Sequence, residues 1–133
     1  MSGSPIKLAV LLSGSGTTLQ NLIDRVRDGS LNAEIVAVVA SRSEIKGIDR
    51  AREAGLPFHL VERTKYSDVS AFSREIFKIC GDAKVELICL GGWLSLLEIP
   101  DGFVGKMMNI HPALLPSFGG KGMYGERVHQ AVL

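Results

Sequence analysis

The chain has 133 residues, of which 46% are hydrophobic and 22% are charged, and its formal net charge is +1. This is the composition of a globular protein, and the length fits one domain with a sizeable core. The near-zero charge gives no reason to expect nucleic acid or an acidic membrane surface as a partner. The longest apolar runs, 6–12 with a single lysine at position 7 and 35–40, are far too short to span a bilayer.

The start of the chain and its cysteines favour a cytoplasmic protein. Residues 1–5 lack both the basic region and the long apolar segment of a secretory signal. The two cysteines, Cys80 and Cys89, form no Cys-x-x-Cys motif, and each falls in an apolar segment. Such cysteines usually act as small apolar core residues in a reducing compartment. We therefore expect both thiols to be free and buried.

Apolar runs and helical repeats alternate along the chain. Continuous apolar runs are typical of strands covered on both faces, and apolar residues at i, i+3, i+4 and i+7 are typical of helices. The predicted strands are 6–12, 35–40, 58–61, 85–90 and 107–110. The predicted helices run from Thr17 to Gly29, from Ile48 to Ala54, from Val69 to Gly81 and from Tyr124 to Leu133.

The ends of these helices carry local signals. Thr17 and Gln20 have the spacing of a capping box at the start of the first helix. Gly29 and Gly81 suit the left-handed residue that ends a helix. The last helix has no such end, so we expect sequence to be missing after Leu133 and residues 1–133 to be one domain that is incomplete at its C-terminus.

Strands that alternate with helices over short links predict an α/β fold. The sheet should be open and mostly parallel, with helices on both faces and right-handed crossovers. Ligands of such sheets bind at the carboxyl ends of the strands. Segments 13–18, 91–97 and 109–116 all follow or end predicted strands. We therefore expect these segments to meet at one edge of the sheet and to form the functional site.

The first of these segments, 13–18, resembles a phosphate-binding turn between a strand and a helix. Its glycines allow close approach of the backbone, and the helix start offers unpaired N–H groups at the positive end of the dipole. Thr17 and Thr18 add hydroxyl donors. No lysine follows the glycine as in a Walker A loop, and Leu19 stands where a dinucleotide fingerprint has its third glycine. A well-capped turn without a ligand is the alternative.

Asn109 and His111 stand where the last apolar run breaks at Pro112. Residues i and i+2 of a strand point the same way, so both side chains should project from one strand end. An amide there can stabilise an oxyanion, and an imidazole can move a proton. The pair suits chemistry at a carbonyl, and the alternative is that both residues only hold the following turn.

Segment 109–118 resembles the signature of the folate-dependent formyltransferases, and segment 10–20 resembles the phosphate loop of the same family. Residues 121–125 with Val128 and His129 resemble a variant found in some members. The resemblance runs from Ile6 to Leu133, and its motifs agree in order and spacing. It is strongest to the members that formylate phosphoribosylglycinamide in purine synthesis. It implies a Rossmann-like formyltransferase fold whose C-terminal part is absent here.

The resemblance also implies the chemistry and the site. The amine of phosphoribosylglycinamide attacks the formyl carbon of 10-formyltetrahydrofolate, and no metal takes part. Asn109 would hold the formyl oxygen and contact the folate, and His111 would stabilise the oxyanion and move the proton. Gly16, Thr17 and Thr18 would hold the substrate phosphate. The loop after Trp93 would line the folate pocket with Leu94, Ser95, Leu96 and Leu97, although Leu96 and Leu97 also fit simple core packing.

Other functions stay open. Members of this family carry a later Asp that orients the histidine, and nothing in this sequence matches it, so we expect weak or no turnover from these 133 residues alone. Hydrolysis of 10-formyltetrahydrofolate is a close alternative, but such hydrolases usually carry an extra N-terminal domain. Formyl transfer to a charged tRNA would call for a more basic surface. A non-catalytic nucleotide-binding fragment is the alternative from another class of protein.

Overall fold

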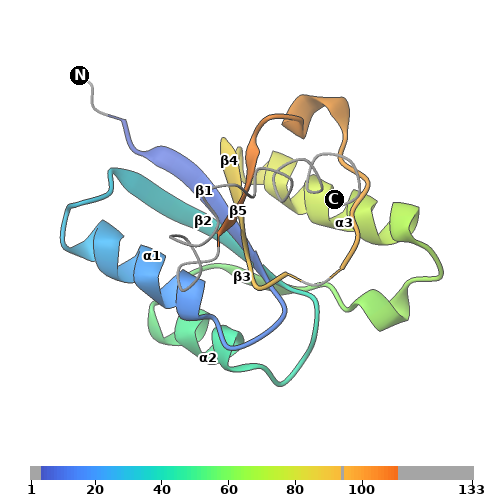
Figure 1. The fold of residues 1–133 in the computed structure, drawn as a ribbon, viewed down its shortest axis with the longest axis horizontal. Helices are drawn as coiled ribbons and strands as arrows, with labels where there is room; N and C mark the ends of the chain where they lie inside the picture. Colours follow the sequence, from blue (N-terminus) through green and yellow to red (C-terminus); the bar gives the residue numbers. More distant parts are fainter. Residues whose placement is uncertain (1–3, 94, 111–133) are drawn as a thin grey trace, which may run out of the picture.

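The computed structural model of the chain describes residues 4–93 and 95–110. Its centre is a sheet in the order β3-β2-β1-β4-β5, and all four neighbouring pairs are parallel (Figure 1). The strands are β1 (Ile6–Leu12), β2 (Ala33–Ala40), β3 (Phe58–Leu60), β4 (Leu87–Gly91) and β5 (Met107–Ile110). The predicted open, parallel α/β sheet is confirmed. The predicted helix 124–133 lies outside the described residues.

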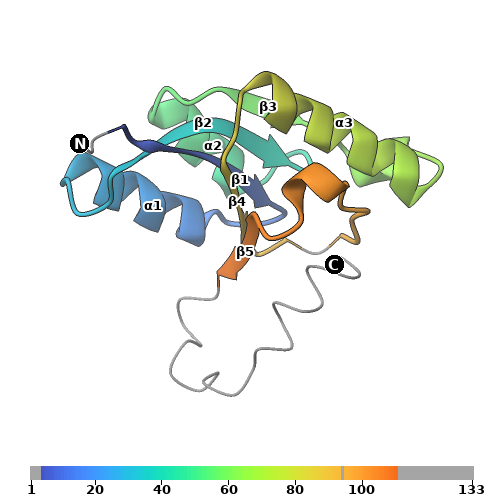
Figure 2. The same cartoon turned by 90° about the horizontal axis from the view of Figure 1, so that it is seen from above.

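Helices cover both faces of the sheet, as the sequence predicts. The helices are α1 (Thr17–Arg27), α2 (Lys46–Glu53) and α3 (Val69–Asp82), with short 3-10 turns at Arg63–Lys65 and Asp101–Phe103. Figures 1 and 2 show α1 and α2 on one face and α3 on the other. No described helix is long and apolar enough to cross a membrane.

The core consists of two apolar layers, one on each side of the sheet. The layer beneath α3 contains Leu11, Leu90 and the fully buried Phe72. The layer beneath α1 and α2 contains Leu12 and Leu19. Successive strand residues point to opposite faces, so a continuous apolar run supplies both layers at once. This is why the apolar runs of the sequence predict strands that are buried on both sides.

The two cysteines lie in different layers, as free thiols. Cys80 belongs to the layer beneath α3, and Cys89 belongs to the layer beneath α1 and α2. Burial raises the pKa of Cys80 to about 12 and the pKa of Cys89 to about 11. Both side chains are therefore neutral thiols near pH 7. A cysteine nucleophile reacts as the thiolate, so neither cysteine is suited to that role. The expectation of free, buried cysteines is confirmed.

The start of α1 differs from the prediction. The N-cap is Gly16, with φ of 80°, and no side chain caps the helix. The Thr17 hydroxyl lies 3.1 Å from the Ser15 hydroxyl, and the Gln20 amide donates to Asp24 instead. The predicted capping box is therefore wrong. The left-handed glycine turns the chain into the helix one residue earlier, so Thr17 is already helical and cannot act as the cap.

The end of α3 also differs from the prediction. The helix passes Gly81 and ends at Asp82, and the left-handed position falls on Lys84, with φ of 60°. The Val85 N–H closes the turn by donating to the Cys80 carbonyl at 3.0 Å. This closing bond delays β4 to Leu87, although the apolar run begins at Val85. A lysine therefore occupies a position that a glycine would fill with less strain.

Lys84→Gly is expected to stabilise the protein by about 0.5–1 kcal/mol, because relief of the left-handed conformation outweighs the extra entropy of an unfolded glycine. Urea unfolding of the natural gene product that contains these residues would measure the change. Lys78→Gly is the matched control, since Lys78 lies inside α3 with an exposed side chain. That change should destabilise the protein by about 1 kcal/mol. Destabilisation by both substitutions would contradict the role assigned to position 84.

The strand order sets the place of the functional site. From β1 the chain moves outward through β2 to β3, and it then returns to place β4 on the other side of β1. The connections after β1 and β4 therefore leave the sheet in opposite directions. In open parallel sheets this switch point opens a crevice at the carboxyl edge. Segments 13–18 and 91–97 begin on either side of it.

Candidate functional site

The loop after β1 leads into α1 at the switch point. Gln20 makes the first helical hydrogen bond, from its N–H to the Gly16 carbonyl at 2.8 Å. Helix geometry then leaves the N–H groups of Thr17, Thr18 and Leu19 without an acceptor inside the helix. These groups lie at the positive end of the helix dipole, where an anion is favoured. The predicted phosphate-binding residues thus stand at a helix start of the expected kind.

Buried hydroxyls fix the beginning of this loop. The Ser13 and Ser41 hydroxyl oxygens lie 2.7 Å apart, and both side chains are buried. The Ser41 N–H donates to the Leu12 carbonyl at 3.1 Å. The carboxyl ends of β1 and β2 are therefore tied together one residue beyond the sheet. This anchor gives the glycine-rich turn a rigid base.

The start of α1 rests directly on the end of β4. A Cβ atom at Gly91 would lie 2.8 Å from the Cβ of Thr18, closer than real side chains approach each other. Gly91 pairs in register with Leu12, the last residue of β1. The absence of a side chain at Gly91 therefore lets the start of α1, after the predicted phosphate-binding turn, and the loop after β4 meet. The two segments that the sequence predicts to be close are adjacent in the structure.

Asn109 lies near the carboxyl end of β5. It pairs in register with Leu90, which in turn pairs with Leu11, so it lies at the same edge of the sheet as the turn after β1. Its side chain is half-buried. Neighbouring Ile110 packs against the layer beneath α1 and α2, so strand alternation directs Asn109 toward the α3 side. His111 lies outside the described residues.

The predicted folate loop has two different sides. Leu97 is only 2% exposed and packs in the layer beneath α3, whereas Leu96 is 57% exposed. Ser95 is half-buried, and Leu94 lies outside the described residues. Leu97 therefore shapes the loop from inside, and Leu96 is available at its surface.

Trp93 anchors the start of this loop. Its ring stacks on Phe72 with centroids 5.9 Å apart and an interplanar angle of 11°. Its indole nitrogen is buried and has no hydrogen-bond partner among residues 4–93 and 95–110. The loop therefore leaves the sheet from an aromatic stack on α3.

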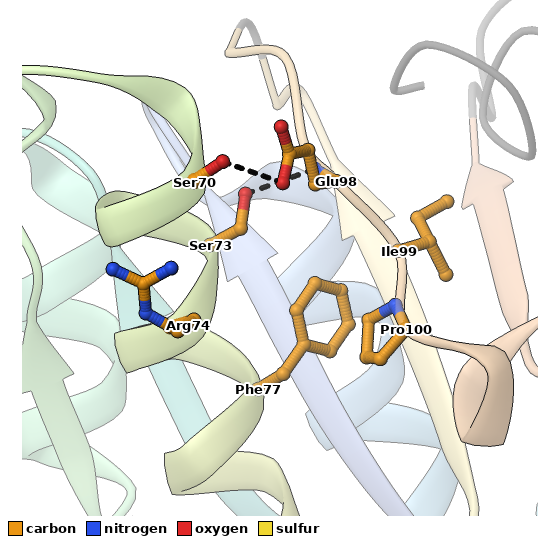
Figure 3. A pocket seen from close by; sticks show the side chains of 7 residues that line it. All are labelled: Ser70, Ser73, Arg74, Phe77, Glu98, Ile99 and Pro100. Atoms are coloured by element: carbon orange, nitrogen blue, oxygen red, sulfur yellow. Dashed lines mark hydrogen bonds between the residues drawn. The ribbon is translucent and has the colours of Figure 1, made fainter.

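A pocket of about 320 Å³ lies beside this loop, between α3 and residues 98–100 (Figure 3). Phe77 and Pro100 line its apolar part. At its other end the Ser70 hydroxyl donates to the Glu98 carboxylate at 2.7 Å, and the Glu98 N–H donates to the Ser73 hydroxyl at 2.9 Å. None of the predicted site residues that the structure describes lines it. No sequence motif indicates this pocket, because it arises only where α3 packs against the connection to β5.

Two residues of α2, which no sequence motif indicates, also contact the site. Gly47 and Arg50 pack against the turn after β1. Their only sequence signal is their place in the helix that follows the second strand. Among the described residues, no group of three His, Cys, Asp or Glu side chains is arranged to hold a metal ion.

The fold and the site define an open, doubly wound α/β protein with a glycine-led helix start at its topological switch point. The chain belongs to the formyl transferase family, whose model matches residues 6–133. This match includes both of the motifs that carry the resemblance, at 10–20 and 109–118.

The chain is similar to longer proteins. It is 38% identical over 131 residues to the trifunctional purine biosynthetic protein adenosine-3 of Bos taurus. The alignment covers 96% of this chain and 12% of that protein. The chain is 37% identical over 130 residues to the chloroplastic phosphoribosylglycinamide formyltransferase of Arabidopsis thaliana, of which it spans 44%. The chain thus spans less than half the length of either relative.

Solved structures have the same fold. Glycinamide ribonucleotide transformylase 1 of Symbiobacterium toebii superposes with a TM-score of 0.79 at 32% identity, over 96% of this chain and 61% of that one. The corresponding protein of Geobacillus kaustophilus gives a TM-score of 0.76 at 34% identity, over 92% of this chain and 66% of that one. A formyltetrahydrofolate deformylase of Pseudomonas putida gives a TM-score of 0.72 at 22% identity, which is evidence for the fold alone.

Proposed function

We propose that this chain carries the phosphate-binding and formyl-handling part of a phosphoribosylglycinamide formyltransferase of purine biosynthesis. The enzyme would transfer a formyl group from 10-formyltetrahydrofolate to the amine of 5-phosphoribosylglycinamide. The observation that carries the proposal is the helix start led by Gly16 at the switch point. It suits a phosphate monoester, and it occurs in a chain 37% identical to a protein named for this reaction.

The phosphate of the ribonucleotide would bind at the start of α1. The backbone N–H groups of Gly16, Thr17 and Thr18 would donate to its oxygens. Thr17 is exposed and Thr18 is buried against Gly91, so Thr17 is the better placed of the two to add a hydroxyl donor. The ribose and the amine would then extend along the carboxyl edge toward β5.

The formyl group would be held next to β5. The amine nitrogen forms a bond to the formyl carbon, the bond from that carbon to the folate nitrogen breaks, and the proton leaves the amine and reaches the folate nitrogen. Asn109 would donate to the formyl oxygen as it gains negative charge. His111 would stabilise the same oxyanion and move the proton. The half-buried position of Asn109 at a strand end supports this role, because a rigid strand fixes the direction of the amide.

The folate ring would lie against the loop after β4. Leu94, Ser95, Leu96 and Leu97 are the proposed lining, together with Asn109. The exposure of Leu96 supports direct contact with a flat apolar ring, and the burial of Leu97 supports an indirect role in shaping the loop. We further propose that the enzyme is cytoplasmic and that its substrates are small molecules.

The proposal is tested by incubating the natural gene product that contains these residues with both substrates. We expect formylated ribonucleotide and tetrahydrofolate to form in equal amounts. Release of formate without formylated ribonucleotide would instead favour the hydrolase. Calorimetric titration of the 133-residue chain with phosphoribosylglycinamide and with a dinucleotide tests binding separately. Binding of the dinucleotide alone would overturn the proposal in favour of a nucleotide-binding module.

A further inference from the structure

Two successive carbonyl groups of the turn after β1 accept hydrogen bonds from α2. The Gly47 N–H donates to the Gly14 carbonyl at 3.2 Å, and the Arg50 Nε donates to the Ser15 carbonyl at 2.8 Å. One donor is a backbone amide of the first turn of α2, which has no acceptor in its own helix. The other is a charged side chain one turn later. The turn is therefore held from behind by a second helix.

Because the peptide bond is planar, these contacts also fix the direction of the N–H groups that follow the two carbonyls. In a trans peptide the C=O of one residue and the N–H of the next point in opposite directions. Since the carbonyls of Gly14 and Ser15 face α2, the N–H groups of Ser15 and Gly16 point away from α2. Two adjacent N–H groups aimed the same way form an anion-binding nest next to the amides of Thr17 and Thr18.

Arg50 packs closely against the turn after β1. A Cβ atom at Gly16 would lie 2.6 Å from the Gly47 Cα and 3.1 Å from the Arg50 Cδ, so the turn packs directly on α2 and on the arginine stem. The Arg50 Nη1 also donates to the Gln20 side-chain oxygen of α1 at 3.3 Å. The half-buried guanidinium thus joins the turn, α1 and α2. The planar guanidinium group can donate to two acceptors at once, and the ammonium group of a lysine is less suited to this.

We propose that Arg50 is a positioning residue for substrate phosphate: it holds the Ser15 carbonyl toward α2 and so directs the N–H groups of the turn at the ligand. The inference rests on the proposed function, because it takes the ligand to be the phosphate of phosphoribosylglycinamide. It adds the Ser15 N–H to the donors of the site. It also gives α2 a part in recognition without any contact to the substrate.

The test is steady-state kinetics of Arg50→Met, which keeps the apolar stem and removes both hydrogen bonds. We expect the KM for phosphoribosylglycinamide to rise by about tenfold or more, as for the loss of a charge-assisted hydrogen bond. The KM for 10-formyltetrahydrofolate and kcat should stay within about twofold. The preference for the ribonucleotide over its dephosphorylated form should fall by the same factor as the KM rises. Arg50→Lys should give an intermediate value, because one ammonium group can restore one bond.

Arg52→Met is the matched control. Arg52 lies on the same helix, its side chain is 65% exposed, and it pairs only with Asp49 at 3.4 Å among the described ion pairs. The substitution removes the same charge but no bond to the turn, so its KM should equal that of the wild type. An equal rise in KM for both variants would mean that charge alone attracts the substrate, and would overturn the role of Arg50.

A second measurement separates positioning from folding. In ¹⁵N NMR spectra, inorganic phosphate should shift the amide signals of Ser15 and Gly16 in the wild type and much less in Arg50→Met. An unchanged ribonucleotide KM in Arg50→Met, or an equal loss of affinity for the dephosphorylated substrate, would overturn the inference. Failure of the wild type to bind the ribonucleotide would instead overturn the proposed function itself, so the two failures are distinguishable.

Discussion

Asn109→Ala is expected to lower kcat for formyl transfer by about 100- to 1000-fold, the usual effect of removing one oxyanion donor from a site that excludes water. The loss should fall on kcat more than on either KM, because the donor strengthens its bond as the formyl oxygen gains charge. The measurement is turnover of the natural gene product that contains these residues, with both substrates saturating.

The control for this prediction lies one residue away. Met108 is 49% exposed and pairs in register with Cys89, so its side chain lies on the other face of β5 from Asn109. Met108→Ala should leave kcat within about twofold, since it truncates an exposed side chain on the same strand. An Asn109→Ala enzyme that keeps more than a tenth of wild-type kcat would contradict the proposed role of the amide.

Much of the fold follows from local sequence patterns, for a simple physical reason. The continuous apolar part of 6–12, residues 8–12, is buried on both faces, as expected of a central strand between two helical layers. The structure has β1 at Ile6–Leu12, between β2 and β4. The wrong predictions concern the ends of helices, because tertiary contacts determine the residue at which a helix begins or ends. Lys84 takes the left-handed position at the end of α3, and Gly16 displaces the predicted capping box.

The candidate site is predictable to the extent that strand ends determine it. The turn after β1, the loop after β4 and Asn109 lie at the same edge of the sheet because parallel strands end at one edge. The contacts of Gly47 and Arg50 with that turn were not predictable, because they depend on how α2 packs against it. The roles of all the candidate site residues stay predictions, as does the single domain over 1–133, and His111 and Leu94 also lie outside the described residues.

Gly16→Ala is expected to have the largest effect on stability in the turn, a loss of about 2–5 kcal/mol. The left-handed conformation costs an alanine about 1–2 kcal/mol, and overpacking against a neighbouring backbone adds about 1–3 kcal/mol. Both terms apply here, since φ is 80° and the new Cβ would lie 2.6 Å from the Gly47 Cα. Urea unfolding of the natural gene product measures the loss, and phosphate titration of the folded fraction should show no binding.

Two other glycines separate the cost of the left-handed conformation from the cost of overpacking. Gly29 has φ of +83° with open space around a new Cβ, so Gly29→Ala should cost only the conformational part, about 1 kcal/mol. A Cβ at Gly14 would likewise have no described atom within 4 Å, and this residue is not left-handed, so Gly14→Ala should change stability by less than about 0.5 kcal/mol. If Gly16→Ala cost no more than Gly29→Ala, the turn would not be pressed against α2. Packing of α2 would then not fix the direction of the N–H groups of the turn.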